Sequence, residues 1–217
     1  GIKGSAVKVI LNGVEQQTRA NKDTVDALRK KYGIEEGDFV VGIMARIEEV
    51  KGHIYLIEAA EKMIKNGKNI KVLIIGTGAL EESLKTKVKE KGLEKNIIFT
   101  GFVKNVNDIL SILDVQANAS FGTEATSLSL LEGMSLGIPA VVSNFGGNPG
   151  VITDGENGYI FKLKDSDDMA RCLEKLMDNR DIYEYMQKRS VEIFNEKFTA
   201  EIYAENIENV YAELMKK

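Results

Sequence analysis

The chain has 217 residues, of which 43% are hydrophobic and 29% charged, and its formal net charge is −4. These values are typical of a globular protein with one large domain or two small ones, and the interleaved charges exclude the basic footprint of a nucleic-acid-binding protein. A single cysteine excludes an internal disulfide, and a single histidine argues against a histidine-based metal site. No apolar run reaches membrane-spanning length and no signal peptide is visible, so we expect a cytoplasmic protein.

Apolar runs alternate with helical patterns along the chain. A short strand is expected first, at 7–11, and fully apolar runs such as FVVGIM and IKVLII are typical of strands buried on both faces. The further strands are predicted at 39–44, 70–75, 96–100, 115–119, 140–143 and 158–161. Apolar residues at helical spacing predict helices at 23–32, 53–66, 80–91, 106–113, 166–178, 182–194 and 199–215.

This alternation, with a period of roughly 20–30 residues, is typical of βαβ units. We therefore predict an α/β fold, namely a three-layer, Rossmann-like domain with a mostly parallel sheet and helices on both faces. Ligands in such folds bind at the carboxyl ends of the strands. No linker or repeat interrupts the pattern, so residues 1–217 are predicted to form one domain. Because the chain opens directly in the strand-like VKVIL, without an initiator methionine, we expect it to be a fragment of a longer protein.

The segment 120–147 carries the strongest chemical signal. Glu124 lies in a loop after an apolar strand, and Glu132 lies on the short helix that follows, which is predicted to begin near Thr126 or Ser127 with a capping hydroxyl. The N-terminus of that helix offers unpaired N–H groups and the positive end of its dipole, which suits phosphate. Glu132 is either a solvated helix residue or, given its apolar neighbours, a carboxylate that needs a partner. Two carboxylates beside a phosphate-binding helix N-terminus predict a phosphorylated sugar or ribose as ligand.

Two cations follow the strand predicted at 39–44. Arg46 and Lys51 stand on either side of the entry to the next helix, where an Arg fork and a Lys point charge suit a diphosphate. The alternative is a pair of solvated surface charges, because Glu48 and Glu49 lie between them and can pair locally.

The turn Gly76-Thr77-Gly78 follows a predicted strand, as in a dinucleotide-binding fingerprint. The third glycine of that fingerprint is missing, since position 81 is Glu, and the acidic residue expected about 20 residues further on is also missing. A plain tight turn is therefore the better interpretation, and a Rossmann-type dehydrogenase is the less favoured function.

Several motifs occur together in one order. VILNGVE near the start is followed by ARIEEVKG with its Arg-x4-Lys pair, LIIGTGALEESL, IIFTGFV and DVQANAS. Glu124 and Glu132 then form a Glu-x7-Glu motif, followed by EGMSLGIPAVVSNFGGNPGVI and DGENGYIF. With these motifs, nearly the whole chain resembles the C-terminal, nucleotide-sugar-binding domain of retaining GT-B glycosyltransferases of the family 4 (group 1) type. Glycogen synthase is a more distant relative. The resemblance implies one half of a GT-B fold.

The resemblance also implies roles for individual residues. Arg46 and Lys51 would hold the diphosphate of a UDP-, GDP- or ADP-linked sugar, Glu132 the ribose hydroxyls, and Glu124 the donor sugar. Arg46, Lys51 and Glu124 would thus carry the catalytic step, with retention of configuration and with no cofactor and no essential metal. The remaining donor-binding residues would be Ser127 and Leu128 through their backbone N–H groups, Val103 beside the base, and Gly76.

The chain departs from the family pattern at three places. Ala125 follows the first glutamate where the family usually has Gly, and the strand before it ends in Asn118-Ala119-Ser120, where a Pro-Ser pair is often found with different spacing. Both departures concern the geometry of the loop around Glu124. Gly150 stands where the family usually has Glu, which argues against a role for that position.

The partners implied are a nucleotide-sugar, an acceptor glycan or lipid, and an N-terminal domain of the same enzyme, towards which the last helix at 199–215 would pack. An enzyme of this kind works at the cytoplasmic face of the plasma membrane, and peripheral contact with the membrane would be made by the other domain. We expect the isolated domain to bind donor without turnover. Two alternatives stay open: a non-catalytic nucleotide-sugar-binding module and, less favoured, a GT-B-type sugar-nucleotide epimerase.

Overall fold

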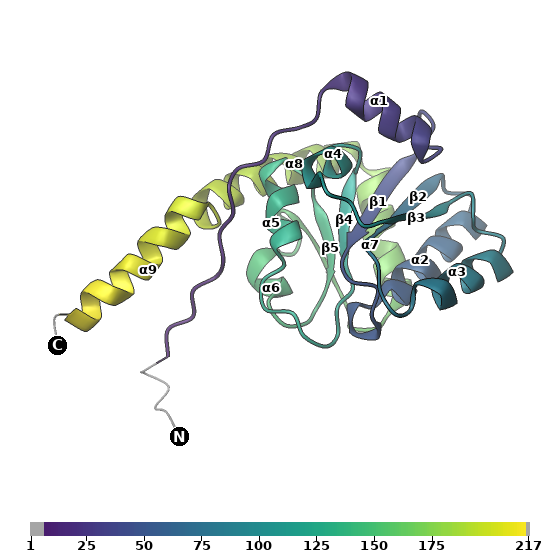
Figure 1. The fold of residues 1–217 in the computed structure, drawn as a ribbon. Coiled ribbons are helices and arrows are strands. Elements are labelled where there is room, and N and C mark those ends of the chain that lie inside the picture. The colour runs from purple at the N-terminus through teal and green to yellow at the C-terminus, as the bar shows by residue number, and fades with distance from the viewer. Residues whose placement is uncertain (1–6, 216–217) are drawn as a thin grey trace.

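The structure is a computed structural model that describes residues 7–215. Within these residues, six strands form one parallel sheet in the order β3-β2-β1-β4-β5-β6 (Figure 1). The strands are β1 (Phe39–Met44), β2 (Ile70–Ile75), β3 (Ile97–Gly101), β4 (Val115–Asn118), β5 (Ala140–Ser143) and β6 (Gly158–Phe161). Consecutive strands are joined by segments that contain helices, as parallel pairing requires.

The helices cover both faces of the sheet. They are α1 (Lys22–Lys31), α2 (His53–Lys65), α3 (Glu81–Glu90), α4 (Val106–Leu110), α5 (Leu128–Ser135), α6 (Asn148–Val151), α7 (Ser166–Asp178), α8 (Arg180–Lys197) and α9 (Ala200–Met215), with a 3₁₀ turn at Glu49–Lys51. The predicted three-layer α/β fold with a mostly parallel sheet is confirmed, and every strand in the described sheet is parallel.

Side-chain alternation along the strands sends apolar residues into two layers. On β1, Val41 and Ile43 belong to a core formed with α2, α3 and α7, whereas Val40 belongs to a core on the opposite face with α1 and α4. On β5, Val142 packs with α5 and with Phe194 of α8 on that opposite face. Burial on both faces explains why these strands read as continuous apolar runs.

Several helix starts follow the expected capping chemistry. The side chain of Asn21 accepts a hydrogen bond of 2.9 Å from the Thr24 N–H at the start of α1, and Asp165 accepts one of 2.9 Å from the Asp168 N–H at the start of α7. Helices α1 and α7, which these side chains cap, and helices α2 and α3, which have no side-chain cap, all begin within one residue of their predicted positions. The short helix α6 and the 3₁₀ turn are not predicted, because neither is long enough to show a periodic pattern.

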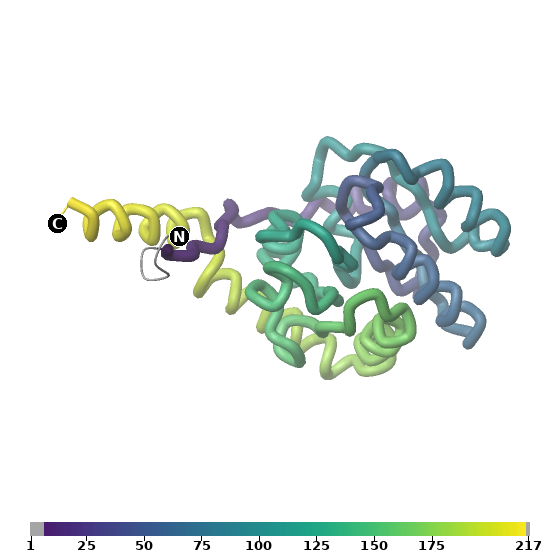
Figure 2. Tube along the Cα trace, turned by 90° about the horizontal axis from the view of Figure 1, so that it is seen from below, coloured from purple at the N-terminus to yellow at the C-terminus, as the bar shows by residue number. Residues whose placement is uncertain are grey.

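The strand predicted at 7–11 is wrong. Residues 7–11 pair with no strand in the described part of the chain, because the segment runs away from the sheet beside α9 (Figures 1 and 2). The first pairing is an isolated bridge between Val14 and Thr199. The apolar run VKVIL has the composition of a strand, but none of the six described strands lies beside it.

Residues 14–20 form a strap across the carboxyl end of α5. The Gln17 N–H donates to Ser135 Oγ at 3.1 Å, the Arg19 guanidinium donates to the Leu136 carbonyl at 2.8 Å, and the Ala20 N–H donates to Ser111 Oγ at 2.8 Å. These contacts join the start of the chain to α5 and to the end of α4. Helix α5, which carries Glu132, is therefore held in place by a segment that is not part of the sheet.

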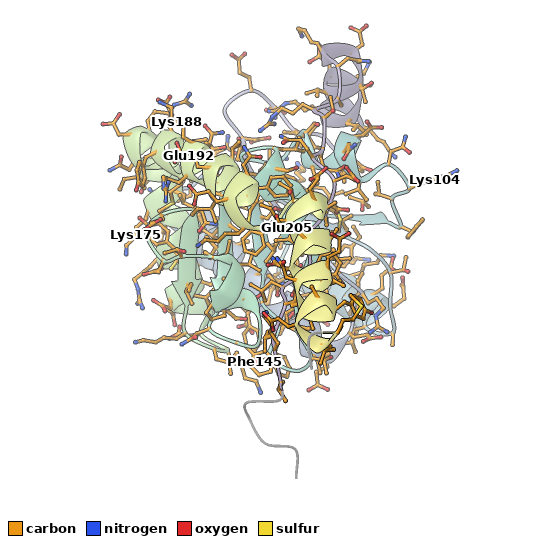
Figure 3. The ribbon with its side chains drawn as sticks, turned by 90° about the vertical axis from the view of Figure 1, so that its left-hand side faces the viewer. Lys104, Phe145, Lys175, Lys188, Glu192 and Glu205 are labelled. Atoms are coloured by element: carbon orange, nitrogen blue, oxygen red, sulfur yellow. The ribbon has the colours of Figure 1, made fainter. Side chains whose placement is uncertain are left out.

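Helix α9 extends away from the body of the domain (Figures 1 and 2) and has no buried residue. In Figure 3, α8, which carries Lys188 and Glu192, and α9, which carries Glu205, run in different directions. Tyr211 is 63% and Leu214 59% exposed, so α9 presents apolar side chains that residues 7–215 leave uncovered. None of the described helices combines the length and the apolar character needed to cross a membrane.

Candidate nucleotide-sugar site

The sheet changes its winding direction between β1 and β4, which are neighbours although β2 and β3 separate them in sequence. In open parallel sheets, such a switch point opens a crevice beyond the carboxyl ends of the two strands. A cavity of about 520 Å³ lies there. Its walls come from the ends of β1 and β4, from the loops that follow these strands and from the start of α5: Ile43, Met44, Ala45, Arg46, Lys51, Ala117, Asn118, Ser120, Glu124, Thr126, Ser127, Leu128 and Ser129. Arg46, Lys51, Glu124, Ser127 and Leu128, all predicted from the sequence, therefore meet in one space.

The two loops that form this cavity are packed tightly together. The Phe121 N–H donates to the Val50 carbonyl at 2.8 Å, which joins the loop after β4 to the loop after β1. Gly52 has φ of +67° and lies so close to β4 that a Cβ there would be 2.1 Å from the Ala119 carbonyl oxygen. Only glycine suits this position, because it combines a left-handed conformation with close approach of another backbone. This contact brings Lys51 beside the loop that carries Glu124.

Aromatic contacts hold the same loop from behind. The Phe121 ring meets the Tyr55 ring edge-on, with centroids 6.0 Å apart, and the Lys164 ammonium lies 4.1 Å from the Phe121 centroid. Lys164 is the one described non-glycine residue with positive φ, at 62°. A cation over an aromatic face is attractive and offsets part of the cost of that backbone conformation.

Lys51 and Glu124 form an ion pair at the centre of the cavity wall. Lys51 Nζ lies 3.1 Å from Glu124 Oε2 and also donates to the Thr123 carbonyl at 3.1 Å. The side chains are only 16% and 9% exposed. The ammonium has three N–H donors, so one of them is left for a ligand. The alternative considered from the sequence was local pairing of both cations with Glu48 or Glu49. In the described structure this pairing is absent for Lys51 but present for Arg46.

Arg46 has a different environment. Its guanidinium pairs with Glu48 at 2.9 Å, and the Arg46 side chain is 73% exposed. An ion pair this exposed contributes little to stability and is easily exchanged for another anion. Arg46 is thus an exposed cation of the cavity, whereas Lys51 is a nearly buried one on its wall.

The N-terminus of α5 faces the same cavity. Ser127 is the N-cap residue, as predicted, but its hydroxyl makes no capping hydrogen bond and instead lies 3.1 Å from Ser129 Oγ. The first N–H groups of a helix have no partner inside the helix. At α5 no side chain caps them, so they are available to an anion in the cavity.

Glu132 lies outside the residues that line the cavity. It is four residues after Leu128 and three after Ser129, so it shares their helix face about one turn, or roughly 5 Å, further along. Burial raises the pKa of Glu132. Its carboxylate accepts no hydrogen bond from residues 7–215.

Two of the predicted donor-binding residues lie elsewhere. Val103 lines a separate cavity of about 300 Å³ between the loop after β3 and the end of α1. Gly76 lines neither cavity; its φ is +134°, and a Cβ there would lie 2.3 Å from the Ala45 carbonyl oxygen. Close packing against the Arg46 loop is therefore sufficient reason for a glycine at position 76. The contacts of Gly76 and Val103 with a donor stay predictions.

The loop after β5 supports the Glu124 loop. The Gly147 N–H donates to the Glu124 carbonyl at 2.9 Å, and Cβ atoms at Gly146 and Gly147 would lie 2.2 Å and 1.4 Å from the carbonyl oxygens of Glu124 and Ala125. Figure 3 shows Phe145 of this loop near the lower end of the molecule. The glycines at 146 and 147 thus serve a backbone-to-backbone contact.

Asn118 and Ser120 are site residues that the sequence analysis did not assign. Asn118 Nδ2 and Ser120 Oγ donate to Glu124 Oε2 at 3.2 Å and 2.9 Å. The available signal was their alternation with Ala117 and Ala119, because polar residues at every second position of a strand share one side. Their target lies in the loop beyond the strand, which strand periodicity does not describe.

His53, the first residue of α2, is 2% exposed, and neither ring nitrogen has a hydrogen-bond partner among residues 7–215. Burial, helped by the charge of Lys51, lowers the pKa of His53 from 6.5 to about 4. The folded protein therefore holds a neutral imidazole, whereas the unfolded chain binds a proton below about pH 6.5. Stability is full above that pH and decreases as the pH falls towards 4.

We expect the free energy of unfolding to fall by about 2 kcal/mol between pH 7 and pH 5 through His53. Urea unfolding at both pH values checks this, with His53→Leu as the comparison. Asp114 and Glu132, whose pKa values burial raises, act in the opposite direction but are present in both proteins. An equal loss of stability in wild type and His53→Leu would contradict the assignment to His53.

Among residues 7–215, no group of three or more His, Cys, Asp or Glu side chains is placed to hold a metal ion. The charged groups of the cavity are two cations and one carboxylate, Arg46, Lys51 and Glu124. Together with the α5 N-terminus, this set can bind an anion that carries hydroxyl groups.

Comparison with known proteins identifies the family. The family described as "Glycosyl transferases group 1" matches residues 24–192. The alpha-monoglucosyldiacylglycerol synthase of Acholeplasma laidlawii is 31% identical over 197 residues, which cover 90% of this chain and 48% of that protein. The chain spans about half the length of the curated relatives it matches.

Two solved structures show the same fold. The C-terminal domain of the group 1 glycosyl transferase LpcC from Francisella tularensis is 27% identical with a TM-score of 0.72, and the match covers 84% of this chain and 95% of that domain. Anabaena HepE, solved in complex with UDP and glucose, is 21% identical with a TM-score of 0.87 and covers 98% of this chain and 58% of its own. The sheet order, the helices on both faces and the family match lead to one conclusion: this chain belongs to the group 1 glycosyl transferases.

Proposed function

We propose that this chain binds a nucleotide-diphosphate sugar in the switch-point cavity, as the donor domain of a glycosyltransferase. The observation that carries the proposal is the meeting of Arg46, Lys51, Glu124 and the α5 N-terminus around one cavity of about 520 Å³. A diphosphate matches the cations and the free N–H groups, and a sugar matches the carboxylate. The complex of HepE with UDP and glucose, in the same fold, supports this choice of ligand.

The diphosphate is proposed to bind first to Arg46 and Lys51. Arg46 exchanges its exposed partner Glu48 for phosphate oxygens, and Lys51 uses its third N–H while it remains bound to Glu124 and Thr123. The N–H groups near Ser127 and Leu128 complete the phosphate site. During transfer, negative charge grows on the leaving diphosphate, and these positive groups stabilise it without a metal ion.

The remaining parts of the donor follow from the same placement. Glu132, one turn along α5 from the N–H groups that bind the phosphate, would accept hydrogen bonds from the ribose hydroxyls. Glu124 would contact the donor sugar, and the base would extend towards Val103, with Gly76 in between. UDP, GDP and ADP are the candidate nucleotides, and the donor is a substrate.

We propose that the complete enzyme transfers the sugar with retention to a glycan or lipid acceptor that a second, N-terminal domain holds. The relative from Acholeplasma laidlawii is named for a glucosylated lipid, which supports an acceptor of this class. Helix α9, with its uncovered apolar side chains, is proposed to pack against that domain. The second domain would also make peripheral contact with the cytoplasmic face of the membrane, and the isolated chain would bind donor without turnover.

Titration calorimetry of this chain with UDP, GDP and ADP tests the proposal. We expect one of the three nucleotides to bind, and Arg46→Ala and Glu132→Ala each to weaken binding about tenfold, the usual loss for one charge-assisted contact. Arg171→Ala is the matched control, because Arg171 is an exposed arginine paired with Asp168 on α7, away from the cavity.

Failure to bind any of the three nucleotides would contradict the proposed site. Binding that Arg46→Ala and Glu132→Ala leave unchanged would show that the nucleotide lies elsewhere on the protein. The same series run with NAD separates this function from that of a dinucleotide-binding domain.

A further inference from the structure

Three donors converge on a single oxygen of Glu124. Lys51 Nζ, Asn118 Nδ2 and Ser120 Oγ lie 3.1, 3.2 and 2.9 Å from Oε2. The other oxygen, Oε1, accepts no hydrogen bond from residues 7–215. The Glu124 carboxylate is therefore fixed at one end and free at the other, and its side chain borders the switch-point cavity.

The two uncharged donors are themselves rigid. Asn118 is 8% exposed, and its Oδ1 accepts a hydrogen bond of 3.1 Å from the Ser120 N–H. Ser120 is 1% exposed, and its carbonyl accepts a hydrogen bond of 2.6 Å from Ser143 Oγ at the end of β5. Neither side chain can turn away without leaving a buried polar group unpaired, which is costly. Their directions are thus set by β4 and β5.

The charged donor, Lys51, and the two neutral donors act on Glu124 in different ways, and the reason is electrostatic. A carboxylate beside a diphosphate is repelled by it, and Lys51 offsets that charge. One cation does not fix the rotation of a carboxylate, whereas two neutral donors, one at the end of β4 and one just after it, do so without adding charge. A fixed orientation avoids the entropy that a mobile Glu124 would lose when it meets a ligand.

We propose that Asn118 and Ser120 are positioning residues that hold Glu124 by Oε2, so that Oε1 is presented to hydroxyl groups of the donor sugar. This inference rests on the proposed function and adds residues that select the sugar. It predicts a separation of effects. Loss of Asn118 or Ser120 weakens binding of the sugar nucleotide, because the sugar meets Glu124, and leaves binding of the nucleoside diphosphate nearly unchanged.

The test uses the 217-residue chain and titration calorimetry. The nucleoside diphosphate that binds wild type is compared with its glucose, galactose and N-acetylglucosamine conjugates. For the best conjugate, Ser120→Ala and Asn118→Leu are expected to weaken binding about three- to tenfold, with less than about a twofold change for the nucleoside diphosphate. Ser190→Ala is the matched control, because Ser190 is a fully buried serine on α8 that bonds to the Asn157 carbonyl. It is expected to change neither affinity.

A double-mutant cycle separates positioning from general structural damage. In a Glu124→Ala background, Ser120→Ala is expected to have no further effect on the sugar nucleotide, because the group that it orients is gone. Circular dichroism and the unfolding midpoint verify that each variant is folded. Equal weakening of both ligands, no change in either, or additive effects in the cycle would each overturn the inference. If wild type binds no nucleoside diphosphate, the proposed function itself fails, which is a different result from failure of the positioning role.

Discussion

Replacement of Lys51 by Met is expected to lower the free energy of unfolding by about 3 kcal/mol, because it leaves the Glu124 carboxylate almost buried without its cation. The Glu124 side chain is 9% exposed, so water can replace the lysine only in part. The same change removes one positive group from the phosphate site. We therefore expect nucleotide binding to weaken by about tenfold or more.

Two further variants separate these effects. Lys51→Met combined with Glu124→Gln removes the unpaired charge as well, so most of the lost stability should return while nucleotide binding stays weak. Lys51→Arg keeps the charge and should keep most of the stability. Urea unfolding and calorimetry on the same samples give both quantities. A Lys51→Met protein as stable as wild type would show that the ion pair does not form in solution.

Gly147→Ala is the second change with a large expected effect. Its Cβ would lie 1.4 Å from the Ala125 carbonyl oxygen, which is backbone and cannot rotate aside, so the Glu124 loop must move. We expect a loss of about 2–3 kcal/mol in stability and a marked loss of sugar-nucleotide affinity. The cause is close approach alone, because Gly147 has φ of −80°, which alanine adopts freely.

Gly150→Ala provides the matched control, three residues away in α6. The nearest atom to its Cβ would be a Leu11 methyl carbon at 3.7 Å, an ordinary contact. Alanine there should be neutral or slightly stabilising, since it favours helix more than glycine does. Thermal unfolding of the two variants checks the contrast, and similar behaviour of both would argue against the packing of Gly147 on the Glu124 loop.

The layered α/β fold was predictable because strands buried on both faces and amphipathic helices leave patterns within single segments. Strands 39–44, 70–75, 140–143 and 158–161 are found at their predicted bounds. The strand order, in contrast, depends on contacts between segments. The run at 7–11 shows the limit, since an apolar run becomes a strand only where a partner offers hydrogen bonds, and none of the strands described between residues 7 and 215 does so there.

The sequence allowed us to predict which loops form the site, but not which side chains in them contact each other. The carboxyl ends of parallel strands meet at one edge, so Arg46, Lys51 and Glu124 were expected near each other. The pairing of Lys51 with Glu124 joins residues 73 positions apart, and the support from Asn118 and Ser120 runs from a strand into a loop. Such contacts depend on the exact path of each loop, which no periodic pattern records.

The bridge between Val14 and Thr199 has a consequence for how this unit can be exchanged. Backbone hydrogen bonds of 3.0 Å and 3.1 Å link Val14 to Phe198 and Ala200, and Lys8 pairs with Glu213 further out, so the chain enters and leaves the fold at one place. Residues 14–199 therefore form a closed loop with a single junction. Chain ends that lie this close together are the arrangement in which circular permutation and domain insertion are tolerated, and the bridge between Val14 and Thr199 is the point at which such changes would be made.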